Sequence, residues 1–266
     1  MKTVALPNGK MVPAIGIGTW KMAEDARHRT AELTSIKRAI DLGMTLIDTA
    51  EMYGEGSAEE LVGEAIRGRR EEVFLVSKVY PHNAGRHAAI AACDRSLLRL
   101  GVERIDLYLL HWRGSVPLSE TFAAFSELLD AGKIGAFGVS NFDVDDMQEA
   151  WADPNGRHLA TNQILYNLTR RSVEHDLLPW CASHRVPVMA YSPVEQGRLI
   201  RKGIPAQTAL AWLLNKEGII AIPKSSDVRH IEENRVAADL VLTTEELAQL
   251  DRAFPRPRKP KPLEML

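Results

Sequence analysis

Eight short apolar runs recur along the chain, each closed by a polar residue, and their spacing limits what the chain can fold into. They cover residues 14–18, 45–48, 73–78, 105–111, 134–140, 160–163, 186–191 and 219–222. The residues that close the second to eighth runs lie 30, 33, 29, 23, 28 and 33 positions apart: Asp48, Lys78, His111, Ser140, Gln163, Tyr191 and Lys224. Each interval has room for one strand and one crossover helix. The spacing predicts an α/β fold, a (β/α)8 TIM barrel.

Amphipathic segments lie between the apolar runs and predict the helices. They cover residues 31–42, 88–100, 118–131, 173–184 and 205–217, and glycine stops follow four of them. At the start, Pro7-Asn8-Gly9 is a turn signal that predicts an N-terminal β-hairpin. No low-complexity linker interrupts the pattern, so we expect residues 1–266 to form one domain. The tail, residues 254–266, is expected either to lie over the barrel or to be left loose.

Charge and cysteine content exclude several classes of partner. The chain has 33 Lys and Arg against 35 Asp and Glu, a net charge of −2, so neither nucleic acid nor a membrane is an expected partner. Cys93 and Cys181 lie far apart, lack metal-ligand spacing and are interpreted as free thiols. No apolar run approaches the roughly 20 residues that span a bilayer. We expect a cytoplasmic protein, without a metal, that acts as a monomer.

The stretch at residues 45–54 holds the first candidate for chemistry. A buried strand is expected to end at Asp48, and Tyr53 follows in a segment closed by two glycines, which let a loop fold back over the strand end. A surface loop with an incidental tyrosine is the alternative for this stretch alone. Catalytic groups of such a barrel lie at the carboxyl ends of its strands. We therefore expect Lys78 and His111 at the same mouth, although Asp48 and Lys78 would also suit a structural ion pair.

These four residues resemble the Asp, Tyr, Lys, His tetrad of the aldo-keto reductases. Their contexts here are Asp-Thr-Ala-Glu-Met-Tyr-Gly, Val-Ser-Lys-Val and Leu-Leu-His-Trp. Other segments are similar to that family's cofactor-binding stretches: residues 138–142, 162–163, 190–193 and 222–225. The resemblance runs over nearly the whole chain. It is strongest to the bacterial branch of methylglyoxal and small-aldehyde reductases, through Trp180-Cys181 and residues 263–266.

The resemblance implies an oxidoreductase that reduces aldehydes and ketoaldehydes, methylglyoxal-like or aromatic, to alcohols by hydride transfer from NADPH. Such a reduction also needs a proton for the carbonyl oxygen, and Tyr53 is the expected donor. The Lys78 ammonium is expected to lower the pKa of this phenol from its ordinary value of about 10. Asp48 would keep Lys78 charged. His111, as a neutral donor, would orient the carbonyl oxygen.

No Rossmann fingerprint or phosphate loop occurs, because Gly16-Ile-Gly-Thr-Trp-Lys lacks the third glycine. The resemblance implies instead that NADPH lies extended across the barrel mouth. The cofactor-binding residues that it implies are Thr19, Trp20, Asp48, Ser140, Asn141, Gln163, Tyr191, Ser192, Pro193, Lys224, Ser225, Ser226, His230 and Asn234. Among them, Tyr191 would stack on the nicotinamide.

Three of these side chains, Ser140, Asn141 and Gln163, would bind the nicotinamide carboxamide. Lys224 and Ser225 would hold the 2′-phosphate, since a helix N-terminus with a lysine suits a dianion. The substrate is expected to be a small-molecule carbonyl compound. The pocket residues expected around it are Trp20, Met52, Tyr80, His111 and Trp112.

Two features depart from the family's pattern. His230 stands where relatives usually carry an arginine over the adenine, which weakens the expected preference for NADPH over NADH. Residues 194–204 replace a longer loop and an added helix, so the fold class includes a shortened loop and helix after the seventh barrel strand. This predicts a more open cofactor site with weaker or faster cofactor exchange. Arg198, Arg201 or Lys202 are expected substitutes for the missing contacts.

Two other functions are compatible with parts of this pattern. A barrel of this kind can serve as an NADPH-binding regulatory or sensor subunit with little turnover, although the intact tetrad argues against that role. A Schiff-base aldolase would use Lys78 as nucleophile. That reaction needs a lysine with a depressed pKa, and Asp48 is expected to oppose such a shift.

Overall fold

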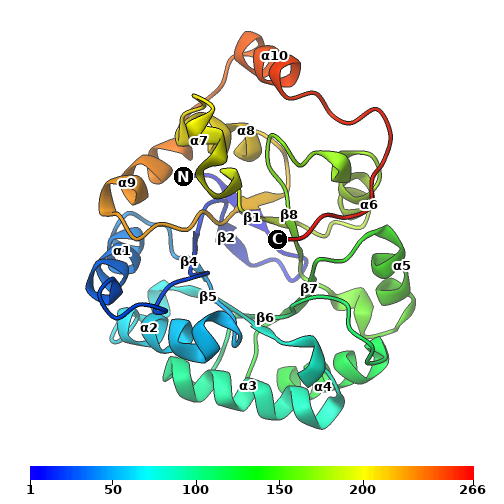
Figure 1. Ribbon diagram of the computed structural model, residues 1–266. Helices are drawn as coiled ribbons and strands as arrows, with labels where there is room; N and C mark the ends of the chain where they lie inside the picture. Colours follow the sequence, from blue (N-terminus) through cyan, green and yellow to red (C-terminus); the bar gives the residue numbers. More distant parts are fainter.

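The computed structural model describes residues 1–266 and contains the barrel that the spacing predicts, seen along its axis in Figure 1. Its strands in chain order are β3 (Ile17–Gly18), β4 (Leu46–Asp48), β5 (Phe74–Val79), β6 (Leu107–Leu110), β7 (Phe137–Ser140), β8 (Asn162–Leu165), β9 (Val188–Tyr191) and β10 (Ile219–Ala221). Each strand pairs in parallel with the next along the chain. Sequential parallel neighbours require crossover helices, so the predicted fold class is confirmed.

Backbone hydrogen bonds between the two ends of this sheet close the barrel. The Ala221 N–H donates to the Ala14 carbonyl at 2.8 Å, and the Gly16 N–H donates to the Ala221 carbonyl at 2.9 Å. Glycine is required at position 16, because a Cβ there would lie 2.4 Å from the Leu46 carbonyl oxygen of β4. The first predicted strand, residues 14–18, therefore pairs with two strands. Its first residues hydrogen-bond to β10, and Ile17 and Gly18 pair with β4.

Ten helices surround the sheet, and Figure 1 shows most of them on its outer face. They are α1 (Arg29–Asp41), α2 (Ser57–Ala65), α3 (Arg86–Leu100), α4 (Leu118–Asp130), α5 (Val144–Ala152), α6 (Leu177–Ser183), α7 (Arg198–Arg201), α8 (Ala206–Leu214), α9 (Val228–Ala237) and α10 (Thr244–Ala253). Four of the five predicted ranges match α1, α3, α4 and α8 within a few residues.

The helix predicted at residues 173–184 begins later than expected. A short 3-10 turn at Ser172–Glu174 comes first, and α6 starts only at Leu177. Its first N–H is capped by the Asp176 carboxylate at 2.6 Å. Pro179 occupies the first turn, where a missing N–H costs nothing, so the helix begins just before it.

The prediction for the sixth barrel strand is displaced by two residues. Residues 160–163 were expected, but β8 runs from Asn162 to Leu165, with Gln163 inside the strand. All four of its residues pair with β9, ending at Leu165 opposite Tyr191. Ile164 and Leu165 are buried and pair with β9, so the strand extends two residues beyond Gln163.

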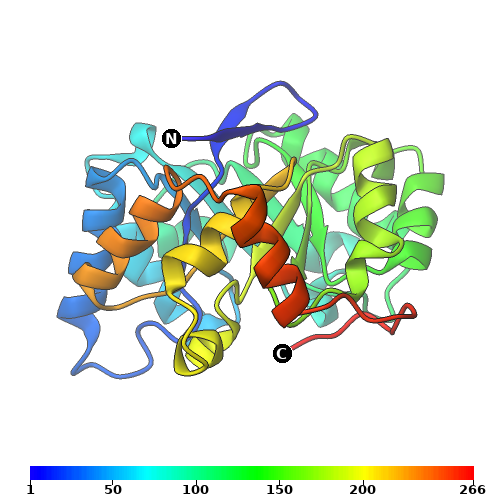
Figure 2. The same ribbon diagram turned by 90° about the horizontal axis from the view of Figure 1, so that it is seen from above.

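The barrel interior is apolar at its amino-terminal end. Leu46, Phe74, Val76, Leu107 and Met189 belong to one buried cluster, together with residues of the N-terminal hairpin. This hairpin, β1 (Thr3–Ala5) with β2 (Met11–Pro13), pairs antiparallel as predicted and lies across one end of the barrel (Figure 2). It closes that end and leaves the opposite end for chemistry.

The C-terminal tail lies at the other end of the barrel. After α10 the chain runs back toward the barrel axis and stops near its centre, as Figures 1 and 2 both show. The Lys261 N–H donates to Ser172 Oγ at 2.6 Å, and His175 Nε2 lies 2.7 Å from the Pro257 carbonyl. Of the two expected outcomes for residues 254–266, the tail laid over the barrel is the one observed. None of the helices combines the length and apolar character needed to cross a membrane.

Asp106 joins the elements at the hairpin end through a buried carboxylate. It accepts hydrogen bonds from the Leu75 N–H at 2.9 Å, Arg70 Nη2 at 2.7 Å and Lys10 Nζ at 3.2 Å. Burial opposes its ionisation, but the Leu75 N–H and the Arg70 charge outweigh burial and hold the pKa of Asp106 below its usual 3.8. The charged carboxylate is therefore the form that the fold uses.

Replacing this carboxylate tests its contribution to the fold. Asp106→Asn leaves the buried partners without their anion, so we expect the free energy of unfolding at neutral pH to fall by about 2–4 kcal/mol. A depressed carboxyl pKa stabilises the fold above the unfolded-state pKa and loses its effect as pH falls through the folded-state pKa. Urea unfolding of both proteins should therefore converge below about pH 4. Lys10→Gln, at the exposed partner, should cost less than about 1 kcal/mol; equal losses would contradict this account.

Candidate active site

The mouth opposite the hairpin holds a fully buried lysine. Lys78, from β5, donates from Nζ to Asp48 Oδ2 at 2.8 Å and to the Thr49 carbonyl oxygen at 2.8 Å. Its third donor reaches the Tyr53 hydroxyl at 3.3 Å. All three N–H groups of the ammonium therefore have acceptors, and one of these acceptors is a phenol. The other oxygen of Asp48 accepts Gln163 Nε2 at 2.7 Å, which fixes the carboxylate from a third strand.

Tyr53 reaches this position through a tight left-handed turn. It begins a 3-10 segment, Tyr53–Gly56, in which Gly54, Glu55 and Gly56 have φ values of 55°, 54° and 98°. Positive φ costs glycine little, so two glycines reverse the chain with one strained residue between them. The phenol is buried and faces the strand end as predicted.

His111 completes the four predicted residues. It directly follows β6, and its imidazole lies edge-on to the Tyr53 ring with centroids 5.6 Å apart. Burial, and then the Lys78 charge, lower the pKa of His111 well below 6.5. The imidazole is therefore neutral at physiological pH, in agreement with the expected role, and its buried Nδ1 has no hydrogen-bond partner in the protein.

The expected direction of the Tyr53 pKa shift is wrong. Burial, followed by the Asp48 charge, raises the pKa of the phenol well above 10. Both disfavour a tyrosinate, because burial removes water and Asp48 repels a second anion. Tyr53 is thus held protonated, ready to donate rather than already ionised.

The argument against a Schiff-base nucleophile also changes. Burial lowers the pKa of Lys78, and Asp48 opposes this shift without reversing it. A depressed pKa alone would suit an aldolase. The geometry nevertheless argues against Lys78 as a nucleophile, since Nζ has no exposed surface and all its N–H groups donate hydrogen bonds. The nitrogen has no free side from which to attack a carbonyl carbon.

A wall of polar side chains continues from the tetrad across the mouth. Asn141, just after β7, donates from Nδ2 to the His111 carbonyl and to Ser140 Oγ, each at 3.1 Å. Its Oδ1 accepts the Tyr191 hydroxyl at 2.9 Å, and Ser140 Oγ donates to the Gln163 carbonyl at 2.9 Å. Asn141 has a φ of 58°, a strained conformation that is common at functional sites. The four predicted residues of this wall therefore form one network.

This wall fits the carboxamide of a nicotinamide. The Gln163 carboxamide oxygen has no donor in the protein, while its nitrogen is fixed on Asp48. The Tyr191 ring is half-buried, so one part of it remains available for stacking. Thr19 donates from Oγ1 to the Asp48 carbonyl at 3.0 Å, which binds the adjoining loop to the same strand end.

A second group of predicted cofactor residues follows β10. Ser225 Oγ accepts the Asp227 N–H at 3.0 Å, and Asp227 caps α9 by accepting the Arg229 N–H at 2.9 Å. Lys224 and His230 are exposed, whereas Asn234 is buried and Ser226 is half-buried. An exposed lysine at the start of a ten-residue helix is free to bind a dianion. Arg229 forms an ion pair with Asp227 at 2.9 Å, so its guanidinium is less available than Lys224 to bind a dianion.

The aromatic residues predicted for the substrate pocket lie around the tetrad. Trp20 and Met52 pack on the small cluster that contains Tyr53. The rings of Tyr80 and Trp112 are edge-on with centroids 4.9 Å apart, and Trp112 lies 5.0 Å from the His111 ring. These residues give the entrance an aromatic lining.

Sequence reasoning missed three contributors to this entrance. The Glu51 carboxylate accepts the Tyr80 N–H at 2.7 Å and Asn83 Nδ2 at 3.0 Å, which fixes the start of the Tyr80 loop. The Lys21 ammonium lies 4.6 Å from the Trp20 ring centroid. Thr49 contributes only its backbone carbonyl oxygen, which accepts a hydrogen bond from Lys78 Nζ. An acidic residue directly before the Met-Tyr-Gly segment was the available signal for Glu51, whereas a backbone acceptor leaves no signal in a sequence.

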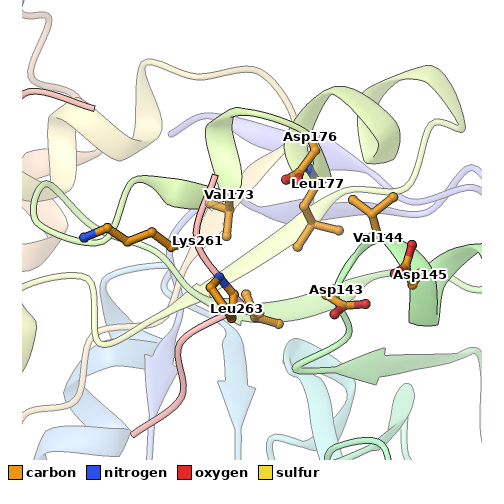
Figure 3. A pocket seen from close by; sticks show the side chains of 9 residues that line it. Asp143, Val144, Asp145, Val173, Asp176, Leu177, Lys261 and Leu263 are labelled. Atoms are coloured by element: carbon orange, nitrogen blue, oxygen red, sulfur yellow. The ribbon is translucent and has the colours of Figure 1, made fainter. Parts of the chain in front are cut away.

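The tail forms a further wall that the sequence did not identify. A cavity of about 260 Å³ is lined by Trp112, Asn141, Leu263 and Met265, with Arg113 and two aspartates at its side. A neighbouring cavity of about 170 Å³ lies between the start of α5, α6 and the tail (Figure 3). In that view Leu263 of the tail lies toward Asp143, whereas the Lys261 side chain extends away from Asp143 and Leu177. Neither cavity is lined by a tetrad residue. The larger one lies beside the tetrad, because its lining residues Trp112 and Asn141 both contact His111, so we place the substrate there.

The loop after β9 is short, as predicted, but ordered into two turns. A 3-10 turn at Glu195–Gly197 leads into α7, a single turn of helix. Pro193 is buried and Ser192 has a φ of 48°. The three expected substitutes for missing cofactor contacts, Arg198, Arg201 and Lys202, are all exposed, and Arg198 also lies 3.5 Å from Glu195.

Fold and site together define a barrel enzyme built around a buried phenol, ammonium and carboxylate. The sequence matches the model of the Aldo/keto reductase family over residues 14–204, and the chain belongs to this family. Methylglyoxal reductase YeaE of Escherichia coli (strain K12) is 47% identical over 281 residues, covering 100% of this chain and 99% of that protein. Glyoxal reductase of Bacillus subtilis (strain 168) is 34% identical over 263 residues, covering 94% and 91%.

Solved structures agree with these matches. The crystal structure of an aldo/keto reductase from Klebsiella pneumoniae in complex with NADP and acetate superposes with a TM-score of 0.96. It is 48% identical and covers 100% of this chain and 99% of that chain. The family resemblance stated from the sequence is confirmed.

The neutral His111 has a measurable consequence. A depressed histidine pKa stabilises the fold above the unfolded-state value, and this contribution is lost as pH falls below about 6.5, where only the unfolded chain binds the proton. The loss should approach about 1.4 kcal/mol per pH unit. We expect urea unfolding at about pH 5 and pH 7 to show a smaller stability difference in His111→Asn than in the wild type. Identical differences in the two proteins would contradict a neutral, buried His111.

Proposed function

We propose that the protein is an NADPH-dependent reductase of aldehydes and ketoaldehydes, with Tyr53 as the proton donor. The observation that carries this proposal is the Tyr53 hydroxyl at 3.3 Å from Lys78 Nζ, with Lys78 paired to Asp48 at 2.8 Å. A buried phenol beside a fixed ammonium supplies a proton and stabilises the anion that remains. Carbonyl reduction needs both.

Each of the four tetrad residues has its own role in carbonyl reduction, and its environment determines that role. Bound NADPH would supply the hydride for the carbonyl carbon. His111, neutral because it is buried, donates a hydrogen bond that orients the carbonyl oxygen toward Tyr53. Negative charge then develops on that oxygen, and Tyr53 transfers its proton to it. Lys78 stabilises the resulting tyrosinate, and Asp48 keeps Lys78 charged despite its burial.

The cofactor proposal assigns the polar wall to the nicotinamide. Ser140, Asn141 and Gln163 would bind its carboxamide, and the half-buried Tyr191 would stack on its ring. At the other end, Lys224 and the N-terminus of α9 would hold the 2′-phosphate, with Ser225, Ser226, His230 and Asn234 beside it. The name of the Klebsiella complex, which contains NADP, supports this choice of cofactor.

For the substrate, we propose methylglyoxal and aromatic aldehydes. The names of the Escherichia coli and Bacillus subtilis relatives support a small dicarbonyl compound. The aromatic lining from Trp20, Tyr80 and Trp112 supports flat substrates, because such rings offer contact area in stacked or edge-on arrangements.

We further propose that the 266 residues act as one domain, as a monomer, in the cytoplasm. All four tetrad residues come from one chain, so the site needs no partner copy. Cys93 and Cys181 are buried free thiols, which suits a reducing compartment.

Loss of a single hydroxyl tests the reductase function. In the wild type, we expect NADPH oxidation, followed at 340 nm, to depend on methylglyoxal or an aromatic aldehyde. Tyr53→Phe should lower kcat at least about 10²-fold, because general-acid help of this kind contributes about 10²- to 10⁴-fold. NADPH binding should persist in the variant. A wild type that binds NADPH without turnover would instead support the regulatory or sensor role.

Cofactor selectivity tests the assignment of Lys224. Lys224→Ala should raise the dissociation constant of NADPH about tenfold and leave that of NADH unchanged, since only NADPH carries the 2′-phosphate dianion. Quenching of tryptophan fluorescence measures both constants. Lys37→Ala, at another exposed lysine, is the matched control. An equal loss for NADH and NADPH would remove Lys224 from the phosphate site.

A further inference from the structure

The loop after β9 is held in a strained backbone conformation. Ser192, Glu195 and Gln196 have φ values of 48°, 50° and 51°, and Gly197 follows at 78°. Three non-glycine residues with positive φ within five positions persist only where surrounding contacts impose them. This loop directly follows Tyr191, so its shape bears on the cofactor site.

A buried carboxylate imposes this conformation. The Glu195 side chain is 5% exposed and accepts Asn167 Nδ2 at 2.7 Å. Its other oxygen accepts both Arg170 Nε at 3.1 Å and Nη2 at 2.8 Å, so two N–H groups of one guanidinium converge on it. Asn167 also donates to the Ser192 carbonyl at 2.9 Å, so the loop is fixed at both of its strained points.

The same guanidinium also holds the C-terminal tail. Arg170 Nη1 donates to Glu264 Oε1 at 2.6 Å. Glu264 stands between Leu263 and Met265, two of the three tail residues that line the cavity beside Trp112. One planar side chain therefore contacts both the loop behind Tyr191 and the tail residue that lies between two lining residues of the proposed substrate cavity.

We propose that Arg170 is a positioning residue that couples the substrate wall in the tail to the cofactor loop after β9. The proposal rests on the proposed reductase function, because it assigns these two surfaces to substrate and cofactor. A guanidinium suits this role, since its fork binds one carboxylate with two N–H groups and presents a third to another carboxylate. A lysine, with its compact charge, cannot reproduce that geometry.

Arg170→Lys is the direct test. It should raise both the dissociation constant of NADPH, measured by tryptophan fluorescence without turnover, and the KM for methylglyoxal, each at least threefold. The kcat should change less than twofold, because Arg170 does not touch the tetrad. A change confined to one of the two constants would overturn the coupling.

Double variants separate this role from a merely structural one. Glu264→Gln should raise the KM in the wild type and have no further effect in Arg170→Lys. Ser172→Ala is the matched control, because it loosens the tail at Lys261 without touching Arg170, and its effect on KM should be the same in both backgrounds. Equal effects of Glu264→Gln in both backgrounds would overturn the proposal.

A second variant covers the case in which Arg170→Lys does not fold. Glu264→Arg changes a side chain that is 42% exposed and places a like charge against Arg170. It should raise both the NADPH dissociation constant and the KM, and wild-type NADPH affinity would overturn the proposal. The wild type is the reference throughout. Its failure to bind NADPH or to turn over aldehydes would count against the reductase function itself, whereas normal wild-type values with unresponsive variants count against the coupling alone.

Discussion

The buried ion pair between Lys78 and Asp48 is the interaction on which the rest of the site depends. Burying two charges is costly, and their attraction offsets the cost only when the remaining donors and acceptors are also satisfied. Here Gln163 satisfies the second carboxylate oxygen, while Thr49 and Tyr53 satisfy the ammonium. The pair therefore requires β4, β5 and β8 to converge, and the contacts that stabilise the strand ends are also those that prepare the phenol to donate.

The two ends of the barrel differ in polarity and in role. The hairpin end is filled with apolar side chains and closed, so it contributes stability and no chemistry. The opposite end carries polar groups at the point where each strand leaves the sheet, and these groups bind one another across strands. Asn141 illustrates the arrangement, because its side chain contacts residues at the carboxyl ends of β6, β7 and β9. Neighbouring strand ends thereby hold each other in register without a ligand.

The sequence predicts whatever follows from spacing and from chemistry at strand ends, which here includes the barrel, the hairpin and the convergence of the tetrad. It does not predict properties that depend on packing. The pKa of Tyr53 moves in the opposite direction to the prediction, because burial and the Asp48 charge both raise it. The contacts of Arg170 with Glu195 and Glu264 join residues 25 and 94 positions apart, without any periodic pattern. The position of the tail was undecided for the same reason.

Closure of the barrel through Ala14 and Ala221 has a consequence for how the protein is made. All four tetrad residues lie before residue 112, yet the strand that seals the sheet is synthesised last. Until it emerges from the ribosome, the edge at β3 exposes unpaired N–H and C=O groups, which can pair with other chains. Pairing across more than 200 residues also slows folding, since distant segments must meet before the contact stabilises either. Synthesis of the tetrad residues is thus completed long before the active site can exist.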